Sequence, residues 1–282
     1  VVALAGMIDL VTVMDGLQKF GYTLEQANEK FGIILGKVDI LTSVPLALNV
    51  AFSTSLVPVV TSAITKGNKK EAINKINYSM KISSIIAFPC AVGLSILAGP
   101  IIQMLFPNAS QGAYLLRIEA FVVIFSVLAQ TAYGSLHGLG KLYIPGISLL
   151  IGAIVKYFLN IVFIPILGEV VVPITTLIYQ AIAVTVSTVC LYTTLNTKYD
   201  KNNILIKPFI ASLIMAVATI LSYYLIHYIT SSNSVATLLS IVVAVATYII
   251  TTANLGALDD KEIMELPYGN KICHFVKKIK KV

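Results

Sequence analysis

Long runs of apolar residues, separated by short polar segments, recur along most of the chain. Seven of them approach the roughly 20 residues that a helix needs to cross about 30 Å of hydrocarbon. They cover residues 39–64, 79–102, 115–136, 144–166, 173–195, 209–229 and 235–252. Residues 1–14 are also apolar but short, and we interpret them as the end of a helix that begins earlier. The pattern predicts eight transmembrane helices, the first one truncated.

The fold class follows from the length and composition of these runs. Strands of a β-barrel would alternate apolar and polar residues over about 10 positions, and these runs do not. Of the 282 residues, 57% are hydrophobic and only 12% are charged, against about 25% charged in soluble domains. A signal peptide would give one short apolar stretch near the N-terminus, whereas here they continue to residue 252. We therefore predict an all-α, polytopic membrane helix bundle.

The basic residues indicate how the helices are oriented. If eight helices alternate in direction, 15 of the 20 lysines and arginines fall on one side, in three connections and the C-terminal tail. The positive-inside rule makes that side cytoplasmic, in the cell membrane. The net charge of +7 then reflects loops that face anionic lipid, and we expect no nucleic-acid partner. The basic tail, residues 256–282, fits a helix on the inner membrane surface or a disordered segment, and we expect anionic lipid there.

Patterns typical of enzymes and metal sites are absent from the sequence. Cys90, Cys190 and Cys273 are far apart and form no CxxC pair. The segment GSLHGLGKL at 134–142 lacks the first glycine and the final hydroxyl residue of a nucleotide-binding P-loop. The acidic residues at 259–265 alternate with Lys261 and are interpreted as a solvated helix start. We predict no catalytic residue, no cofactor and no metal.

Polar residues inside the apolar runs are the candidate site residues. They recur at helical spacing and comprise Asp9, Asp39, Asn49, Glu119, Gln130, Lys156 and Asn160. Polar groups at membrane depth face other helices or a cavity. Each set therefore fits either interhelical hydrogen bonds that hold the bundle together or a hydrated pathway.

Four segments, in this order, resemble a known transporter family. They are LTSVPLALNVAFSTSLVPVVTSA at 41–63, KGNKKEA at 66–72, YGSLHGLGKLYIP at 133–145 and IGAIVKYFLN at 151–160. They are similar to the polysaccharide biosynthesis and stage V sporulation protein B family. That family belongs to the multidrug, oligosaccharidyl-lipid and polysaccharide (MOP) flippase superfamily and is related to the lipid II flippase MurJ. One departure is Asp15-Gly16, where the family often carries arginine.

The resemblance implies the domain organisation. The eight helices would correspond to helices 7–14 of a fourteen-helix flippase. Residues 1–195 would form the C-terminal six-helix lobe, residues 196–255 two additional helices and residues 256–282 the cytoplasmic tail. The partner of this lobe would be the missing N-terminal lobe of the same transporter.

The resemblance also implies a function. The protein would be an ATP-independent flippase for a lipid-linked oligosaccharide or peptidoglycan precursor, used in polysaccharide, cell-wall or spore-cortex synthesis. Two alternatives stay open: a multidrug or cation antiporter of the same superfamily, and a membrane scaffold for cell-wall enzymes that transports nothing.

Lys156 is the residue on which this function depends most. It lies 12 residues after Ile144, or about 18 Å along a helix, near the middle of the membrane. Burying lysine there costs roughly 2.5 to 3.5 kcal/mol, so a compensating partner is needed. Asp9 on a neighbouring helix is one candidate; a hydrated cavity in which the ammonium meets an anionic pyrophosphate is the other. The resemblance and the nearby Asn160 lead us to favour the cavity.

Overall fold

The computed structural model describes residues 2–197 and 200–256. This part of the chain is helical throughout, with short turns between the helices and no strand in the described residues. The predicted basic tail lies outside the described residues. The prediction of an all-α membrane bundle is confirmed.

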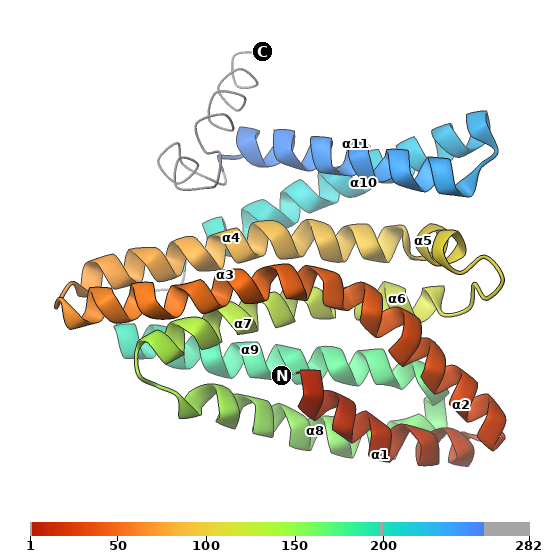
Figure 1. Ribbon diagram of the computed structural model, residues 1–282, viewed down its shortest axis with the longest axis horizontal. Coiled ribbons are helices and arrows are strands. Elements are labelled where there is room, and N and C mark those ends of the chain that lie inside the picture. Colours follow the sequence, from red (N-terminus) through yellow and green to blue (C-terminus); the bar gives the residue numbers. More distant parts are fainter. Residues whose placement is uncertain (1, 198–199, 257–282) are drawn as a thin grey trace.

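Eight membrane-length helical segments make up the described part of the chain (Figure 1). They are α1 (Val2–Phe20), α3 (Asp39–Thr65), α4 (Lys69–Ile96), α6 (Ala113–Glu119) followed by α7 (Val122–Gly138), α8 (Tyr143–Leu167), α9 (Val171–Leu195), α10 (Lys207–Thr230) and α11 (Asn233–Asn254). Shorter elements connect them: α2 (Leu24–Ile33), η1 (Ile34–Val38), α5 (Ala98–Leu105), η2 (Gly168–Val170) and η3 (Asn202–Ile206). The predicted number of eight transmembrane helices agrees with this arrangement.

Helix ends differ from the apolar runs where local capping or a turn decides them. α4 begins ten residues before the predicted Ser79, because the Asn68 side chain accepts a hydrogen bond from the backbone N–H of Glu71 and caps the helix. The run 79–102 is divided at Leu97 into α4 and α5. The run 115–136 is divided at Ala120 and Phe121 into α6 and α7. The hydropathy pattern shows which part of a helix is apolar, but it does not show such caps and breaks.

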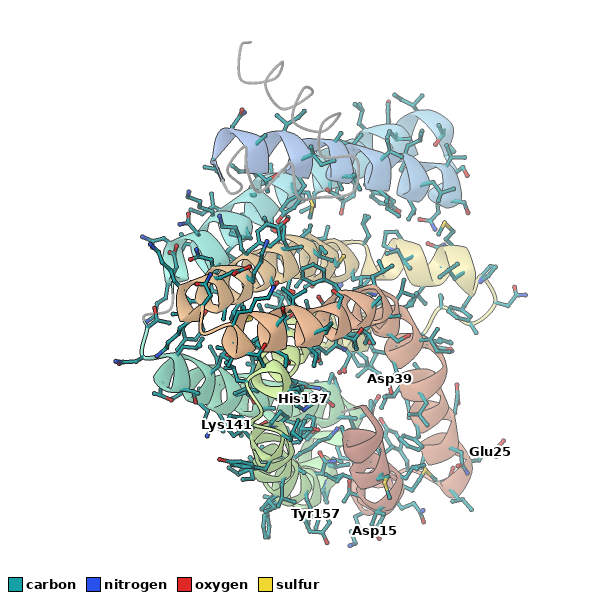
Figure 2. The ribbon with its side chains drawn as sticks, turned by 60° about the vertical axis from the view of Figure 1, so that its left-hand side comes forward. Asp15, Glu25, Asp39, His137, Lys141 and Tyr157 are labelled. Carbon is teal, nitrogen blue, oxygen red and sulfur yellow. The ribbon has the colours of Figure 1, made fainter. Side chains whose placement is uncertain are left out.

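Consecutive spans alternate in direction. The α3–α4 and α7–α8 turns lie at one end of the bundle, on the left in Figure 1, and the α1–α2, α8–α9 and α10–α11 turns lie at the other. Figure 2 labels His137 and Lys141 near the α7–α8 turn and Asp15 and Glu25 on the α1 and α2 side. The alternation on which the orientation argument depends is therefore present.

Close helix packing depends on small residues at the crossings. A Cβ added to Gly152 on α8 would lie 2.8 Å from the carbonyl oxygen of Tyr179 on α9. A Cβ on Gly134 of α7 would collide with the backbone of Ser53 on α3. Glycine lets two backbones approach closely inside a membrane, where dispersion and hydrogen bonds hold helices together.

The pair α10–α11 packs on one side of the other helices. Its buried residues form an apolar cluster with α4 that includes Val92, Ala211, Met215 and Tyr248. In Figure 1 this pair lies beyond α4 and α5, away from α1 and α8. The two predicted additional helices thus meet the remaining bundle through α4 and α5.

The outer surface of the bundle is apolar, as a lipid-facing surface must be. Leu48, Phe158, Leu221 and Val242 are each more than 60% exposed. Six continuous helical stretches are long and apolar enough to cross a membrane, and one of them, Tyr143–Leu195, turns at Gly168 and contains both α8 and α9. The chain is a multi-pass membrane protein.

Candidate functional site: a buried polar centre

Three helices bring polar side chains together inside the membrane-spanning bundle. We call this group the buried polar centre; it consists of Asp9 and Thr12 on α1, Lys156 and Asn160 on α8, and Thr175 and Thr176 on α9. Lys156 and Asn160 are fully buried and Asp9 is 8% exposed. Charged and amide groups at such depth require partners, and here they supply one another.

Lys156 pairs with an acid. Its Nζ donates to Asp9 Oδ2 at 2.6 Å and to Thr176 Oγ1 at 2.9 Å. The side chain of Lys156 is 0% exposed and that of Asp9 is 11% exposed. Of the two partners considered from the sequence, the structure therefore shows the acid on a neighbouring helix. The ammonium and the carboxylate neutralise each other in this conformation.

Asn160 joins the other oxygen of Asp9 to the surrounding threonines. Its Nδ2 donates to Asp9 Oδ1 at 3.0 Å and to Thr12 Oγ1 at 2.9 Å, and its Oδ1 accepts from Thr175 Oγ1 at 2.6 Å. Asp9 thus accepts from both Lys156 and Asn160, one on each oxygen. A network in which each member is satisfied specifies one arrangement of the three helices.

Local sequence explains why these residues meet. Lys156 and Asn160 are four positions apart and so share one face of α8. Gly168, with a backbone φ of +69°, then begins the tight turn that reverses the chain into α9. The reversal lays Thr175 and Thr176 beside that face of α8.

Two further predicted site residues, Asp39 and Glu119, lie close to the buried polar centre. Asp39 interacts electrostatically with Asp9 and Lys156, and Glu119 interacts with Asp39. Glu119 is 5% exposed. Asp39 begins α3 directly after the π-helical turn η1, a geometry frequent at functional sites. The region therefore holds three carboxyl groups and one lysine.

Asn49 and Gln130 belong to a different network. Asn49 Nδ2 donates to Gln130 Oε1 and to the backbone oxygen of Val127, both at 3.0 Å, while its Oδ1 accepts from Ser83 Oγ at 3.0 Å. Ser83 and Thr131 complete the network at 2.6 Å. These contacts join α3, α4 and α7. For this set of polar residues they fit the first of the two interpretations made from the sequence, interhelical hydrogen bonds that hold the bundle together.

A polar cluster that the sequence did not reveal lies at the α8–α9 turn. Glu169 Oε1 pairs with Lys30 Nζ at 2.9 Å and accepts from Tyr114 Oη at 2.6 Å, and Glu169 Oε2 accepts from Tyr22 Oη at 2.9 Å. We call these four residues the Glu169 cluster. It joins the α1–α2 turn, α2, α6 and the α8–α9 turn at the end of the bundle that is poor in lysine. Its members are far apart in the chain, so no spacing pattern indicates it.

Comparison with known proteins identifies the family. The sequence model of the family described as lipid II flippase MurJ matches residues 37–244. The chain belongs to the MurJ family. It is 27% identical over 236 residues to the uncharacterized membrane protein YabM of Bacillus subtilis (strain 168), covering 81% of this chain and 44% of YabM. It is 30% identical over 140 residues to the lipid II flippase MurJ of the same organism, covering 48% of this chain and 26% of that protein.

Solved structures agree with the MurJ assignment. The fold is similar to that of lipid II flippase MurJ in an inward closed conformation, with a TM-score of 0.67, 20% sequence identity, and coverage of 90% of this chain and 51% of that one. It is also similar to an outward-facing MATE family multidrug resistance transporter of the MOP superfamily, with a TM-score of 0.53 and 17% identity, over 98% of this chain and 67% of that one. This MurJ-family chain spans about half the length of YabM and of the solved MurJ chain.

The MurJ assignment confirms the resemblance stated from the sequence. MurJ proteins and their MOP relatives are transporters, and the expectation of a non-enzymatic protein agrees with that. The matched range 37–244 contains Lys156 and Asn160, whereas Asp9 lies before it. The buried polar centre therefore joins four residues inside the matched MurJ range to two outside it, Asp9 and Thr12.

Proposed function

We propose that this chain is part of an ATP-independent flippase that moves a lipid-linked oligosaccharide or peptidoglycan precursor across the cytoplasmic membrane. Membership of the MurJ family supports transport of a lipid-linked substrate. One relative, the MurJ of Bacillus subtilis (strain 168), is named a lipid II flippase, which supports the peptidoglycan precursor in particular. In this proposal the lysine-rich loops face the cytoplasm, residues 1–195 form one lobe, and α10 and α11 guide the lipid tail.

One observation carries the proposal: a lysine held at the centre of a span by a single acid, Asp9, at 2.6 Å. The head group of a lipid-linked sugar carries an anionic pyrophosphate, which would compete with the Asp9 carboxylate for the Lys156 ammonium. Separation of α1 from α8 would expose Lys156 to such an anion. Return of Asp9 would release the anion on the other side. Lys156 is thus available as a cation in one conformation and is neutralised by Asp9 in the other.

Vesicle transport measures this function directly. The full-length protein, reconstituted into vesicles without nucleotide, is expected to move a fluorescent lipid-linked sugar pyrophosphate between leaflets faster than empty vesicles do. A phospholipid with the same fluorophore serves as the control and should move at the background rate. Strict dependence on ATP, or export of a soluble cation with no movement of the lipid-linked sugar, would contradict the proposal.

A further inference from the structure

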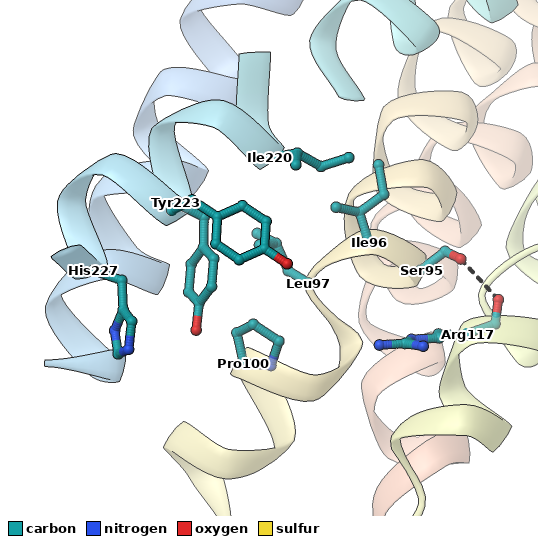
Figure 3. A pocket seen from close by; sticks show the side chains of 9 residues that line it. Ser95, Ile96, Leu97, Pro100, Arg117, Ile220, Tyr223 and His227 are labelled. Carbon is teal, nitrogen blue, oxygen red and sulfur yellow. Dashed lines mark hydrogen bonds between the residues drawn. The ribbon is translucent and has the colours of Figure 1, made fainter. Parts of the chain in front are cut away.

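A pocket near the lysine-poor end of the bundle contains the one arginine of the chain, Arg117. The pocket has a volume of about 520 Å³ and lies between α4, α5 and α6 on one side and α10 on the other. Figure 3 shows the Arg117 side chain directed toward Pro100, with Tyr223 and His227 on the opposite side of the pocket. The pocket is separate from the buried polar centre, whose residues are on α1, α8 and α9.

Arg117 is available for an anionic ligand. Arg117 is exposed, and its side chain forms no ion pair or hydrogen bond with any described residue. None of the nine described residues that line the pocket is acidic. A guanidinium without an acid, in a pocket whose other wall carries phenol and imidazole groups, is suited to binding a phosphate through two parallel N–H bonds.

The walls of the pocket are fixed by hydrogen bonds that leave Arg117 unengaged. Ser95 Oγ donates to the backbone oxygen of Arg117 at 2.9 Å, which holds α6 against the end of α4. Tyr223 Oη donates to Asn233 Oδ1 at 2.8 Å, and Asn233 Nδ2 donates to the Pro100 oxygen at 3.0 Å. These bonds tie α5, α10 and α11 together. The pocket is therefore part of the packed fold.

The pocket opens beside a lipid-facing surface. Leu221, Tyr224 and Leu225 on α10 are 65%, 69% and 62% exposed. His227 lies three residues, or about 4.5 Å, before the end of α10 at Thr230, and Tyr223 about 10 Å before it. Tyrosine at this depth is typical of the boundary between hydrocarbon and head groups. A ligand here would have its anionic group at Arg117 and its apolar part along α10.

We propose that the Arg117 pocket binds the phosphate of an anionic phospholipid from the lysine-poor leaflet, with the acyl chains lying along α10. This site goes beyond the proposed transport function, because it would hold a bulk membrane lipid at the seam between α10 and the rest of the bundle. Occupancy would join Arg117 of α6 to Tyr224 of α10 through one ligand. The lipid would act as a structural ligand and would not cross the membrane.

Native mass spectrometry of the full-length protein in detergent tests the proposal, with phosphatidylglycerol, phosphatidylcholine and inorganic phosphate as probes. Wild-type protein is expected to retain one phosphatidylglycerol in preference to phosphatidylcholine and to retain no inorganic phosphate. Arg117→Gln should weaken phosphatidylglycerol retention by about tenfold, the loss of one charge-assisted contact. Arg117→Lys should retain part of the preference, and Tyr224→Phe should lose less than Arg117→Gln.

Lys19→Gln is the matched control, since Lys19 is an exposed cation at the same end of the bundle and pairs with Asp15 outside the pocket. It should bind phosphatidylglycerol like the wild type. Equal retention by wild type and Arg117→Gln, or equal retention of the two phospholipids by the wild type, would overturn the proposal. Binding of inorganic phosphate as tight as that of phosphatidylglycerol would overturn the lipid assignment. Preferential displacement of phosphatidylglycerol by a lipid-linked pyrophosphate would do so as well, by assigning the pocket to the transported substrate.

Discussion

Lys156 and Asp9 form a buried ion pair between residues 147 positions apart in the chain. In such a pair each charge depends on the other for compensation, so removal of one leaves the other uncompensated. Lys156→Gln alone is therefore expected to destabilise the protein by about 3 kcal/mol or more. Adding Asp9→Asn should restore most of that loss. Membrane abundance and the thermal midpoint in detergent measure both effects.

The same variants separate a structural role of the pair from a functional one. Our proposal expects the double variant Asp9→Asn, Lys156→Gln to be abundant but unable to flip the lipid-linked sugar, because no ammonium is left to bind the pyrophosphate. Lys156→Arg should keep part of the transport. Lys141→Gln, on the same helical hairpin, is the control and should be active. A double variant that transports like the wild type would show that the pair serves only to hold α1 against α8.

The sequence predicted the residues of this pair better than their surroundings. Asp9 and Lys156 could be named as partners because each is a charge within an apolar run. Thr12, Thr175 and Thr176 could not, since a threonine in a membrane helix can bond the carbonyl four residues before it, as Thr12 and Thr176 also do here. The neighbouring helix decides whether a threonine bonds only within its own helix or also joins a network between helices. The hydrated cavity in which the Lys156 ammonium would meet a pyrophosphate, which we favoured from the sequence, stays a prediction.

At the scale of helices, Gly152 decides how closely α8 and α9 approach. Its Cβ position is filled by Tyr179, so Gly152→Ala is expected to destabilise the protein by about 1 to 3 kcal/mol through overpacking. Gly146, on the same helix, has nothing within 4 Å of the added Cβ. Gly146→Ala should be neutral or slightly stabilising, because alanine is the better helix former. Thermal unfolding of both variants in one detergent gives the comparison, and equal midpoints would refute the packing argument.

The Glu169 cluster connects turns that hydropathy cannot relate to one another. Glu169→Gln removes the ion pair with Lys30 and weakens the bonds from Tyr22 and Tyr114, so we expect a loss of about 2 kcal/mol. Faster hydrogen exchange in the α1–α2 turn should accompany it. The exposed pair Asp15–Lys19 gives the control, since both side chains are more than 60% exposed and such pairs contribute little. An Asp15→Asn variant as unstable as Glu169→Gln would contradict this account.

At this scale the sequence predicted spans well and their ends less well. The apolar run 144–166 and α8 (Tyr143–Leu167) agree within a residue at each end, because this helix begins and ends where its apolar residues do. The lysine-rich first turns of α4 were missed, since they extend beyond the apolar part. The Glu169 cluster was missed for a different reason: its four residues lie in separate turns and helices and become neighbours only when the helices pack.

For the whole molecule, the side of the membrane on which each end of the bundle lies can be measured. Single cysteines in place of Asn68 and Asn202, in a background without Cys90, Cys190 and Cys273, are expected to be blocked by a reagent confined to the cytoplasm. Cysteines in place of Ser110 and Thr230 should react from outside. The reason is that the first two lie at the lysine-rich end and the other two at the opposite end. Reaction of Asn68→Cys and Ser110→Cys from the same side would refute the orientation.

The position of α10 and α11 has a consequence for how the chain is assembled as it is synthesised. These helices are made after α9, yet their partner outside their own hairpin is mainly α4, which leaves the ribosome more than 100 residues earlier. The face of α4 around Val92 must therefore wait, covered by lipid or by a helper protein, until the hairpin arrives. Since α10 and α11 contact each other more extensively than they contact any other helix, they can enter the bilayer as a finished hairpin and dock in one late step.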